Sequence, residues 1–372
     1  MRGHCFVDGV EKHVKCAYVG VNGKAQYIMK PPGVIKYGGS VEKILNSGQN
    51  VSAGSIGDYI LIAGGSIYDR SSKSWTYYDS VSAYDKSFVQ TSAPVLSSKR
   101  APLYSGVTIG NHVIFGASFS SNYVDAYDSN LTKTAISKFN NCSRYTVKNG
   151  ISLGNYAIFG GGGSSSSSVF AEIYDSSLTK ISNSYKFSKR SFGMMAASIE
   201  NYAIFAGGTT SSMIPPSESD IYSDAIAFNK NLTNVSIKSL SHPRWNSAAT
   251  NINKKYAIFS GDGESNITSI DAYDSELTLT TINSAFYKYS LNSVGVSINN
   301  YALLGGSSSN ASWKRVIVFD INLVKSIAPD LEDIGYYISA TSDTAKKYAV
   351  FTGGSRYNGI MNVYTYNDGY IP

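Results

Sequence analysis

Arginine and tyrosine recur at one spacing along this sequence. Twelve residues before each copy of an apolar phrase described below, the chain carries four arginines, two tyrosines and one serine. These residues are Ser47, Arg100, Arg144, Arg190, Arg244, Tyr289 and Tyr336. A guanidinium group binds carboxylates and other anions through paired hydrogen bonds. Brought to one rim, these positions would form a site for an anionic or carbohydrate ligand. The alternative is that each arginine braces its own turn by bonding loop carbonyls or a neighbouring aspartate.

A second set of candidates is aromatic. The segment of residues 66–80 carries Trp75, Tyr77 and Tyr78, and Trp245 follows directly after one of the arginines. Tyrosine and tryptophan on loops supply rigid contact area together with a polar atom. We therefore expect these four residues to anchor a contact surface for a ligand or partner. The arginines and the two tyrosines of the first set would orient its polar groups.

The apolar phrase occurs seven times, at intervals of 44 to 54 residues. One copy reads Tyr156-Ala-Ile-Phe-Gly-Gly, and the others begin at Tyr59, His112, Tyr202, Tyr256, Tyr301 and Tyr348. Each copy has the length of a buried strand, and strand-like runs precede and follow it. A repeat of this length with four strands per copy predicts an all-β fold, a seven-bladed β-propeller of four-stranded blades.

The third run of several units ends in an aromatic residue and an aspartate, as in Val124-Asp-Ala-Tyr-Asp and Ile270-Asp-Ala-Tyr-Asp. We expect the ring to pack against the next blade and the last carboxylate to bond its own turn. Glycine pairs after the second run allow positive φ and close approach of neighbouring backbones. A strand ending in Gly-Gly followed by one ending in Tyr-Asp resembles the kelch family over residues 40–372. That resemblance implies a propeller, although the tryptophan usual at the start of the fourth kelch run is missing here.

The last unit has no fourth run of its own, because too few residues follow its third. Residues 41–46 align with residues 135–140, which we assign to a fourth run. The sequence therefore predicts that residues 41–46 form the outermost strand of the last blade. This arrangement closes the ring and leaves no unpaired edge between the first and last blades.

Residues 1–30 form a different module. Asp8-Gly9 and Asn22-Gly23 are typical of two-residue hairpin turns, which predicts a small β-meander of two tandem hairpins. Pro31-Pro32-Gly33 predicts a stiff linker over residues 31–39, before the propeller of residues 40–372. The phrase of residues 17–25, Ala-Tyr-Val-Gly-Val-Asn-Gly-Lys-Ala, resembles a short repeat of tail-associated proteins of phages and prophages. It implies that residues 1–30 dock on virion structural proteins.

Few residues suit catalysis or metal binding. The chain has four histidines and three cysteines, and no P-loop, Gly-x-Ser-x-Gly or His-Glu-x-x-His motif. We therefore expect no catalytic residues and no cofactor. The residues with ligand chemistry near the start of the chain lack the usual zinc spacing, so no metal site is expected; they are His4, Cys5, His13 and Cys16. Loop carboxylates leave a carbohydrate-active enzyme open as an alternative; they are Asp69, Asp220, Asp262 and Glu264.

Charge and hydropathy exclude other classes of partner. The net charge is +6, of which residues 1–38 contribute +4, so the propeller has no basic excess for a nucleic acid backbone. No apolar stretch has the length of a signal peptide core or a membrane span. We expect neither nucleic acid binding nor membrane insertion, and synthesis in the bacterial cytoplasm without a signal peptide.

These observations favour a non-enzymatic protein of a phage tail, baseplate or fibre, located in the virion. Residues 1–30 would dock to the virion. The propeller would bind a host cell-surface glycan or protein, or a neighbouring virion protein. The alternative from another class is a bacterial kelch-like adaptor that binds a protein partner.

Overall fold

A computed structural model describes most of the chain. The segments that it does not describe are residues 1–2, 8–9, 15–16, 22–23, 30–33, 42–48, 70, 102–105, 117–120, 141–148, 162–168, 182–185, 188–190, 212–215, 262–267, 284–291, 308–313, 333–337, 344–346, 355–360 and 368–372. The described residues are all β apart from one 3-10 turn, η1 (Glu218–Asp220). The fold class predicted from the repeats is therefore confirmed.

Seven four-stranded antiparallel sheets follow one another along the chain. From the innermost to the outermost strand, the first blade contains β6 (Ser52–Ile56), β7 (Tyr59–Ala63), β10 (Val81–Tyr84) and β11 (Gln90–Ser92), and the second contains β12 (Val107–Ile109), β13 (His112–Phe115), β14 (Val124–Asp128) and β15 (Lys133–Ile136). The third blade contains β16 (Asn149–Leu153), β17 (Tyr156–Gly160), β19 (Glu172–Asp175) and β20 (Lys180–Ile181), and the fourth contains β22 (Met195–Ser198), β23 (Tyr202–Ala206), β24 (Ala225–Asn229) and β25 (Asn234–Ser236). The fifth blade contains β26 (Ala249–Ile252), β27 (Tyr256–Phe259), β28 (Ile270–Tyr273) and β29 (Leu279–Ile282), and the sixth contains β30 (Val294–Ile298), β31 (Tyr301–Gly305), β32 (Val316–Asp320) and β33 (Lys325–Ala328). The seventh blade contains β34 (Ile338–Ser342), β35 (Tyr348–Gly353), β36 (Met361–Asn367) and β5 (Val34–Val41). In every blade the apolar phrase forms the second strand.

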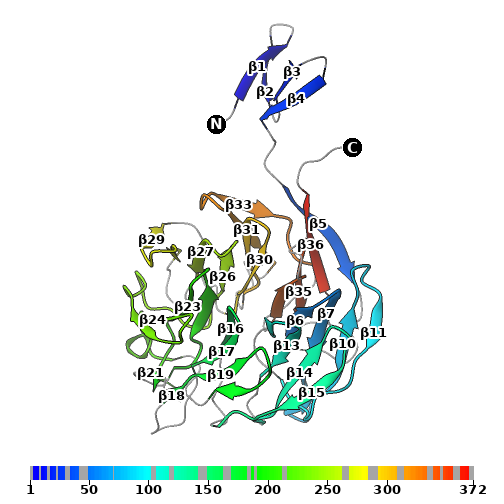
Figure 1. Cartoon of the computed structure of the whole chain (residues 1–372), viewed down its shortest axis with the longest axis vertical. Helices are drawn as coiled ribbons and strands as arrows, with labels where there is room; N and C mark the ends of the chain where they lie inside the picture. Colours follow the sequence, from blue (N-terminus) through cyan, green and yellow to red (C-terminus); the bar gives the residue numbers. More distant parts are fainter. Residues whose placement is uncertain are drawn as a thin grey trace.

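The blades are arranged as a closed ring (Figure 1). The first strand of each blade contacts the first strand of the next, and β34 of the last blade contacts β6 of the first. Between neighbouring blades lies one cluster of buried apolar side chains, and the described residues form seven such clusters. The core is therefore divided among seven interfaces, each built from the facing sheets of two blades.

The turn between the third and fourth strands is the same in six blades. Its first residue accepts hydrogen bonds from the backbone N–H groups two and four residues later, as Asp128 does from Asn130 (2.9 Å) and Thr132 (2.8 Å). The others are Asp85, Asp175, Asn229, Asp274 and Asp320. This confirms the predicted turn. The residue three places on is Leu or Phe at positive φ, a costly conformation for a bulky side chain. Packing of that side chain against an interblade cluster offsets the cost.

The ring is closed by an N-terminal strand, but not by the residues expected. The outermost strand of the last blade is β5, which pairs with β36 from Val41 opposite Met361 to Val34 opposite Asn367. Residues 41–46 had been aligned with residues 135–140, whereas the corresponding strand of the second blade, β15, ends at Ile136. Residues 137–140 therefore follow that strand, so the alignment was shifted along the chain; residues 42–46 lie outside the described residues. The strand β5 begins inside the segment predicted as a linker.

Before β5, the chain forms two hairpins in tandem. β1 (Gly3–Val7) pairs with β2 (Val10–Val14), and β3 (Ala17–Val21) pairs with β4 (Lys24–Met29). Val7 lies opposite Val10, and Val21 opposite Lys24, so each connection has two residues, as predicted. The hairpins lie outside the ring of blades (Figure 1).

The pairing of β5 with β36 makes a prediction about stability. A protein that begins after Val41 loses this strand and leaves the outer edge of β36 unpaired, so we expect a large drop in melting temperature and aggregation. A protein that begins at Gly33 keeps β5 and should melt within about 2 °C of the full chain. Differential scanning calorimetry of both proteins tests this. Equal melting of the two would show that β5 does not stabilise the ring.

The repeated turn makes a second prediction. Asp128→Ala removes two hydrogen bonds to backbone N–H groups, so we expect it to lower the free energy of unfolding by about 1–2 kcal/mol. Asp128→Asn should cost much less, because Asn229 makes the same two bonds in the fourth blade. Urea denaturation of both variants measures the difference. Equal losses would mean that charge, not hydrogen bonding, stabilises this turn.

Candidate functional site at the loop rim

In the first and fourth blades, the segment before the first strand meets the loop after the second strand on one rim of the ring, as predicted for every blade. Gln49 and Ser66 of the first blade exchange two backbone hydrogen bonds of 2.8 Å. Phe192 and Thr209 of the fourth blade do the same at 2.9 Å. We call this surface the loop rim. It is where the predicted arginine and aromatic positions lie, insofar as the structure describes them.

Glycine pairs allow consecutive blades to approach on the loop rim. The second glycine of a pair donates its N–H to the arginine carbonyl of the following blade, as Gly65 does to Arg100 (3.0 Å) and Gly208 to Arg244 (2.6 Å). Gly207 and Gly208 have φ of 68° and 115°. A Cβ at Gly207 would clash with the Arg244 carbonyl, and one at Gly208 with the Ser191 hydroxyl. A side chain at Gly207 would therefore force the fourth and fifth blades apart, whereas one at Gly208 would disturb packing within the fourth blade.

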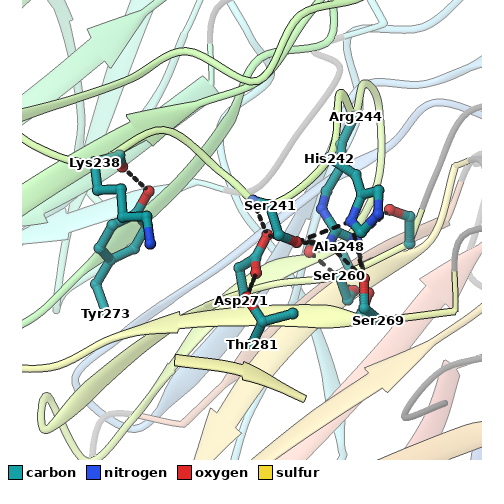
Figure 2. Close-up of polar contacts among 11 residues, drawn as sticks. Lys238, Ser241, His242, Arg244, Ala248, Ser260, Ser269, Asp271, Tyr273 and Thr281 are labelled. Atoms are coloured by element: carbon teal, nitrogen blue, oxygen red, sulfur yellow. Dashed lines mark hydrogen bonds and ion pairs between the residues drawn. The ribbon is translucent and has the colours of Figure 1, made fainter. Parts of the chain in front are cut away.

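Arg244 is the centre of a buried hydrogen-bond network (Figure 2). Its side chain is 0% exposed and donates to the carbonyls of Gly261 (2.8 Å) and Ser269 (2.7 Å). It also forms an ion pair of 3.0 Å with Asp271, likewise 0% exposed. Asp271 accepts further bonds from the Ser241 N–H (2.9 Å), the Ser241 hydroxyl (2.9 Å) and the Thr281 hydroxyl (2.6 Å). The backbone of Arg244 bonds the fourth blade while its side chain bonds the fifth, so this residue clamps two blades together.

Arg100 repeats this arrangement between the first and second blades. Its guanidinium donates to Asp125 at 2.8 Å and to the Phe115 carbonyl at 3.3 Å, and both charged side chains are 0% exposed. Asp125 also accepts hydrogen bonds from the N–H and the hydroxyl of Ser97. Burial lowers the pKa of Arg100, and the nearby Asp125 carboxylate opposes this shift by stabilising the charged guanidinium. The electrostatics thus favour the ion pair that the geometry shows.

These networks correct part of the predicted contact surface. Arg100 and Arg244 are not available to a ligand, because their side chains are buried and bonded to an aspartate of their own blade. The structure supports the bracing alternative for both. Trp245 is only 3% exposed, so it is a core residue of the rim and not a surface anchor. Four further predicted residues, Arg144, Arg190, Tyr289 and Tyr336, lie outside the described residues, as does Ser47.

Tyrosines of the third strands also join blades, in a direction opposite to the one expected. The hydroxyl of Tyr127 donates to the Pro94 carbonyl (2.7 Å), and that of Tyr273 donates to the Lys238 carbonyl (2.5 Å). Both acceptors belong to the preceding blade, so each tyrosine side chain packs against the preceding blade and not against the next one. Burial raises the pKa of Tyr127 and Tyr273, which keeps each hydroxyl protonated as a donor. Tyr174 and Tyr364 make the same contact with Ser137 and Pro329.

Two exposed aromatic residues of the loop rim, Tyr68 and Trp75, lie on a hairpin that sequence patterns did not reveal. β8 (Ser66–Asp69) pairs with β9 (Ser74–Tyr77), and Tyr68 lies opposite Trp75. These two rings are 39% and 43% exposed, and their centroids are 5.1 Å apart. Two aromatic-containing runs around a four-residue Ser-rich loop were the available signal. The predicted anchor Trp75 is therefore at the surface, whereas Tyr77 and Tyr78 are half-buried at the base of the hairpin.

The turn of this hairpin is tied by Asp69. Its carboxylate accepts bonds from the N–H and hydroxyl of Ser71 (2.8 and 2.7 Å) and from the hydroxyl of Ser72 (2.7 Å). The Ser71 and Ser72 bonds lower the pKa of Asp69 to about 2. A lowered pKa means that this contribution is present above the ordinary value of 3.8 and is lost as pH falls through about 2. The turn therefore keeps these bonds at neutral pH.

In the described part of the chain, no group of three or more His, Cys, Asp and Glu side chains could hold a metal ion. Ser241 lies 3.0 Å from Nδ1 of His242, but its hydroxyl donates to Asp271, so its proton is not directed to that nitrogen (Figure 2). No helix among the described residues is long and apolar enough to cross a membrane.

Comparison with known proteins supports the fold. A solved structure titled "Structure of YjhT" is 11% identical, with a TM-score of 0.53, and the match covers 77% of this chain and 99% of that one. Virginiamycin B lyase from Staphylococcus aureus is 9% identical, with a TM-score of 0.56, and the match covers 89% of this chain and 99% of that one. No family model matches the chain. No curated protein matches it either. The kelch and phage-tail resemblances therefore stay predictions.

The lyase corrects one expectation. We had inferred from the sequence that the chain is not an enzyme. A lyase with the same fold shows that this architecture supports catalysis, so that inference does not stand. At 9% identity the likeness concerns the fold alone, because functions on a shared fold depend on their sites.

The buried Arg244–Asp271 pair makes a prediction that separates bracing from binding. Arg244→Met leaves a buried carboxylate without its cation, so we expect the free energy of unfolding to fall by about 3–5 kcal/mol. The double variant Arg244→Met with Asp271→Leu should lose less than the two single losses combined. Lys230→Met is the control: this lysine is 49% exposed and pairs with Glu200 at 3.5 Å, so the loss should be within about 1 kcal/mol. Additive losses in the double variant would contradict the pairing.

Proposed function

We propose that this protein is a binding component of a phage tail, baseplate or fibre. Residues 1–30 attach it to a virion structural protein. The propeller contacts a host cell-surface glycan or protein, or a neighbouring virion protein, through its loop rim. The propeller itself is a scaffold, so the proposal depends on what the scaffold displays.

The observation that carries the proposal is the exposed hairpin of β8 and β9. Ile67, next to Tyr68, is 44% exposed and pairs with Thr76, on the opposite face of the hairpin from Trp75. Apolar side chains are therefore exposed on both faces of one projecting element. Tyr68 and Trp75 already pack against each other, and the Asp69 bonds hold the turn, so little conformational freedom remains to be lost on binding. Aromatic residues presented in this way are the usual energetic anchors of protein contacts.

Attachment through the N-terminal hairpins is supported by two features. The phrase resembling tail-associated repeats covers β3, residues 22–23 and the first two residues of β4, which is most of one hairpin. A two-stranded hairpin has marginal stability by itself in water, and a partner surface would supply the missing packing. Six basic residues against two acidic ones in residues 1–38 favour an acidic partner surface.

The contact proposal is tested by truncating the hairpin anchor. Trp75→Ala should weaken binding to host cells, or to the virion partner, by about 30-fold, the effect of losing about 2 kcal/mol at a contact anchor. Its melting temperature should not change, because the side chain packs on the surface. Ile327→Ala is the matched control: this residue of β33 is 68% exposed on an outermost strand, away from the loop rim. Binding that is equal for Trp75→Ala and the unaltered protein would exclude the hairpin as the contact.

The attachment proposal is tested by comparing incorporation into tails of the full chain and of a protein that begins at Gly33. We expect only the full chain to be incorporated, with both proteins binding the propeller's target equally. Equal incorporation would favour the alternative of a free-standing adaptor.

A further inference from the structure

A cavity of about 550 Å³ lies between the first strands of the blades. Residues of all seven first strands line it, from β6 around the ring to β34. Since these strands contact one another in a closed ring, the cavity lies on the axis of the propeller. It is separate from the exposed hairpin of the loop rim, whose residues do not line it.

One register of these strands carries a hydrogen-bonding side chain in every blade. In each case the residue pairs with the second residue of the apolar phrase on the neighbouring strand. The seven residues are Ser55, Thr108, Ser152, Ser198, Asn251, Ser297 and Ser342. All seven line the cavity. A hydroxyl both donates and accepts, and so does an amide, so this ring offers both kinds of bond around the axis.

Four of these hydroxyls have unused bonding capacity, those of Ser55, Ser152, Ser198 and Ser297. Ser55, Ser198 and Ser297 are 7%, 6% and 6% exposed. Their side chains have no hydrogen-bond partner among the residues that the structure describes. Ser293 and Ser339, which also line the cavity, differ because their hydroxyls accept the N–H groups of Ala248 and Ala53 at 3.0 Å. Hydroxyls that face a cavity without a protein partner bond whatever occupies the space beside them.

The lining is almost free of charge. Lys254 is the one charged side chain among the described lining residues. It lies in the turn after β26, is 65% exposed and has Glu200 at 3.9 Å, so its charge is at the mouth and partly balanced. The rest of the lining consists of small hydroxyl, amide, glycine and aliphatic residues. Such a surface suits a neutral ligand with many hydroxyl groups better than a phosphate or a carboxylate, which would need fixed cations.

We propose that the axial cavity binds a neutral polyhydroxylated small molecule, a saccharide of one or two units, through the ring of hydroxyls. Its volume falls within the range of small-molecule sites. The hydroxyls of Ser55, Ser198 and Ser297, the most buried of those without protein partners, are the primary contacts. This site goes beyond the proposed loop-rim function and does not depend on it.

The test uses the full chain and isothermal titration calorimetry with named probes. The probes are glucose, N-acetylglucosamine, their β-1,4-linked dimers, and glucuronate as an anionic comparison. We expect millimolar or tighter binding of at least one neutral probe. The double variant Ser198→Ala with Ser297→Ala should weaken that binding tenfold or more, since each lost hydroxyl removes a hydrogen bond worth about threefold to tenfold. Its melting temperature should be unchanged, because neither hydroxyl bonds a described residue of the protein.

Two controls locate the site. Ser177→Ala removes an exposed hydroxyl in the turn after β19 and should leave binding unchanged. Trp75→Ala should also leave it unchanged, which separates this proposal from the loop-rim contact. As a second measurement, the bound probe should shift the amide resonances of Gly106, Gly150 and Gly295, which line the cavity.

Four outcomes would overturn the proposal. No binding of any neutral probe at millimolar concentration would mean that the cavity holds solvent only. Undiminished binding by the double serine variant, without shifts at the three glycines, would place the site elsewhere. Loss of saccharide binding in Trp75→Ala alone would assign it to the hairpin. Tighter binding of glucuronate than of glucose would make the site anionic.

Discussion

A closed ring of blades requires the first and last blades to pack together, although the chain that forms them has two ends. The rest of this structure depends on how the two ends of the chain close the ring. Every apolar cluster lies between two blades, so the stability of each blade depends on both neighbours. The cluster between the last and first blades brings together Val350, Met361 and Val363 with Ile60, Ile62 and Tyr84. Backbone pairing of β36 with β5 completes the sheet on which half of that cluster rests. Without β5, the outer edge of β36 would be unpaired. The side chains that β36 contributes to this cluster would then be held less firmly.

The loop rim shows how this ring uses its polar residues. A buried guanidinium is costly to desolvate, and Arg244 meets that cost with two carbonyls, two hydroxyls and a carboxylate. Its backbone meanwhile bonds the preceding blade. The residue type best suited to hold an anionic ligand is therefore used here to hold the protein's own loops. Among the described residues, the paired exposed rings of the rim, Tyr68 and Trp75, come instead from the loop of the first blade.

The repeated features of the sequence predicted the repeated features of the structure. The apolar phrases became second strands, and the aspartates after the third strands formed the expected turns, because both depend on local chain properties. Burial of Arg244 depends on Asp271, which is distant in sequence and close only after the third strand folds back. The hairpin of β8 and β9 lies in the loop between the second and third strands of the first blade, outside the repeated strands. The repeat therefore could not predict it. The closing strand was misplaced because β5 has no neighbouring repeat to set its register, and its partner is at the other end of the chain. The hydroxyl ring was also missed, since its pattern appears only when the seven first strands are aligned by their pairing.

Closure by β5 also governs the order of events when the chain is made. Met361 must find Val41, its partner across nearly the whole chain, and the loop that this contact closes is among the longest that the fold contains. Such contacts form late, because their entropic cost is met only after the intervening residues are already compact. During translation the first blades can fold as they are synthesised. The strand β5 remains unpaired at that stage, because its partner strand has not yet been made. The growing protein is thus an arc with one unpaired strand at its beginning. Only the synthesis of β36 makes it a ring.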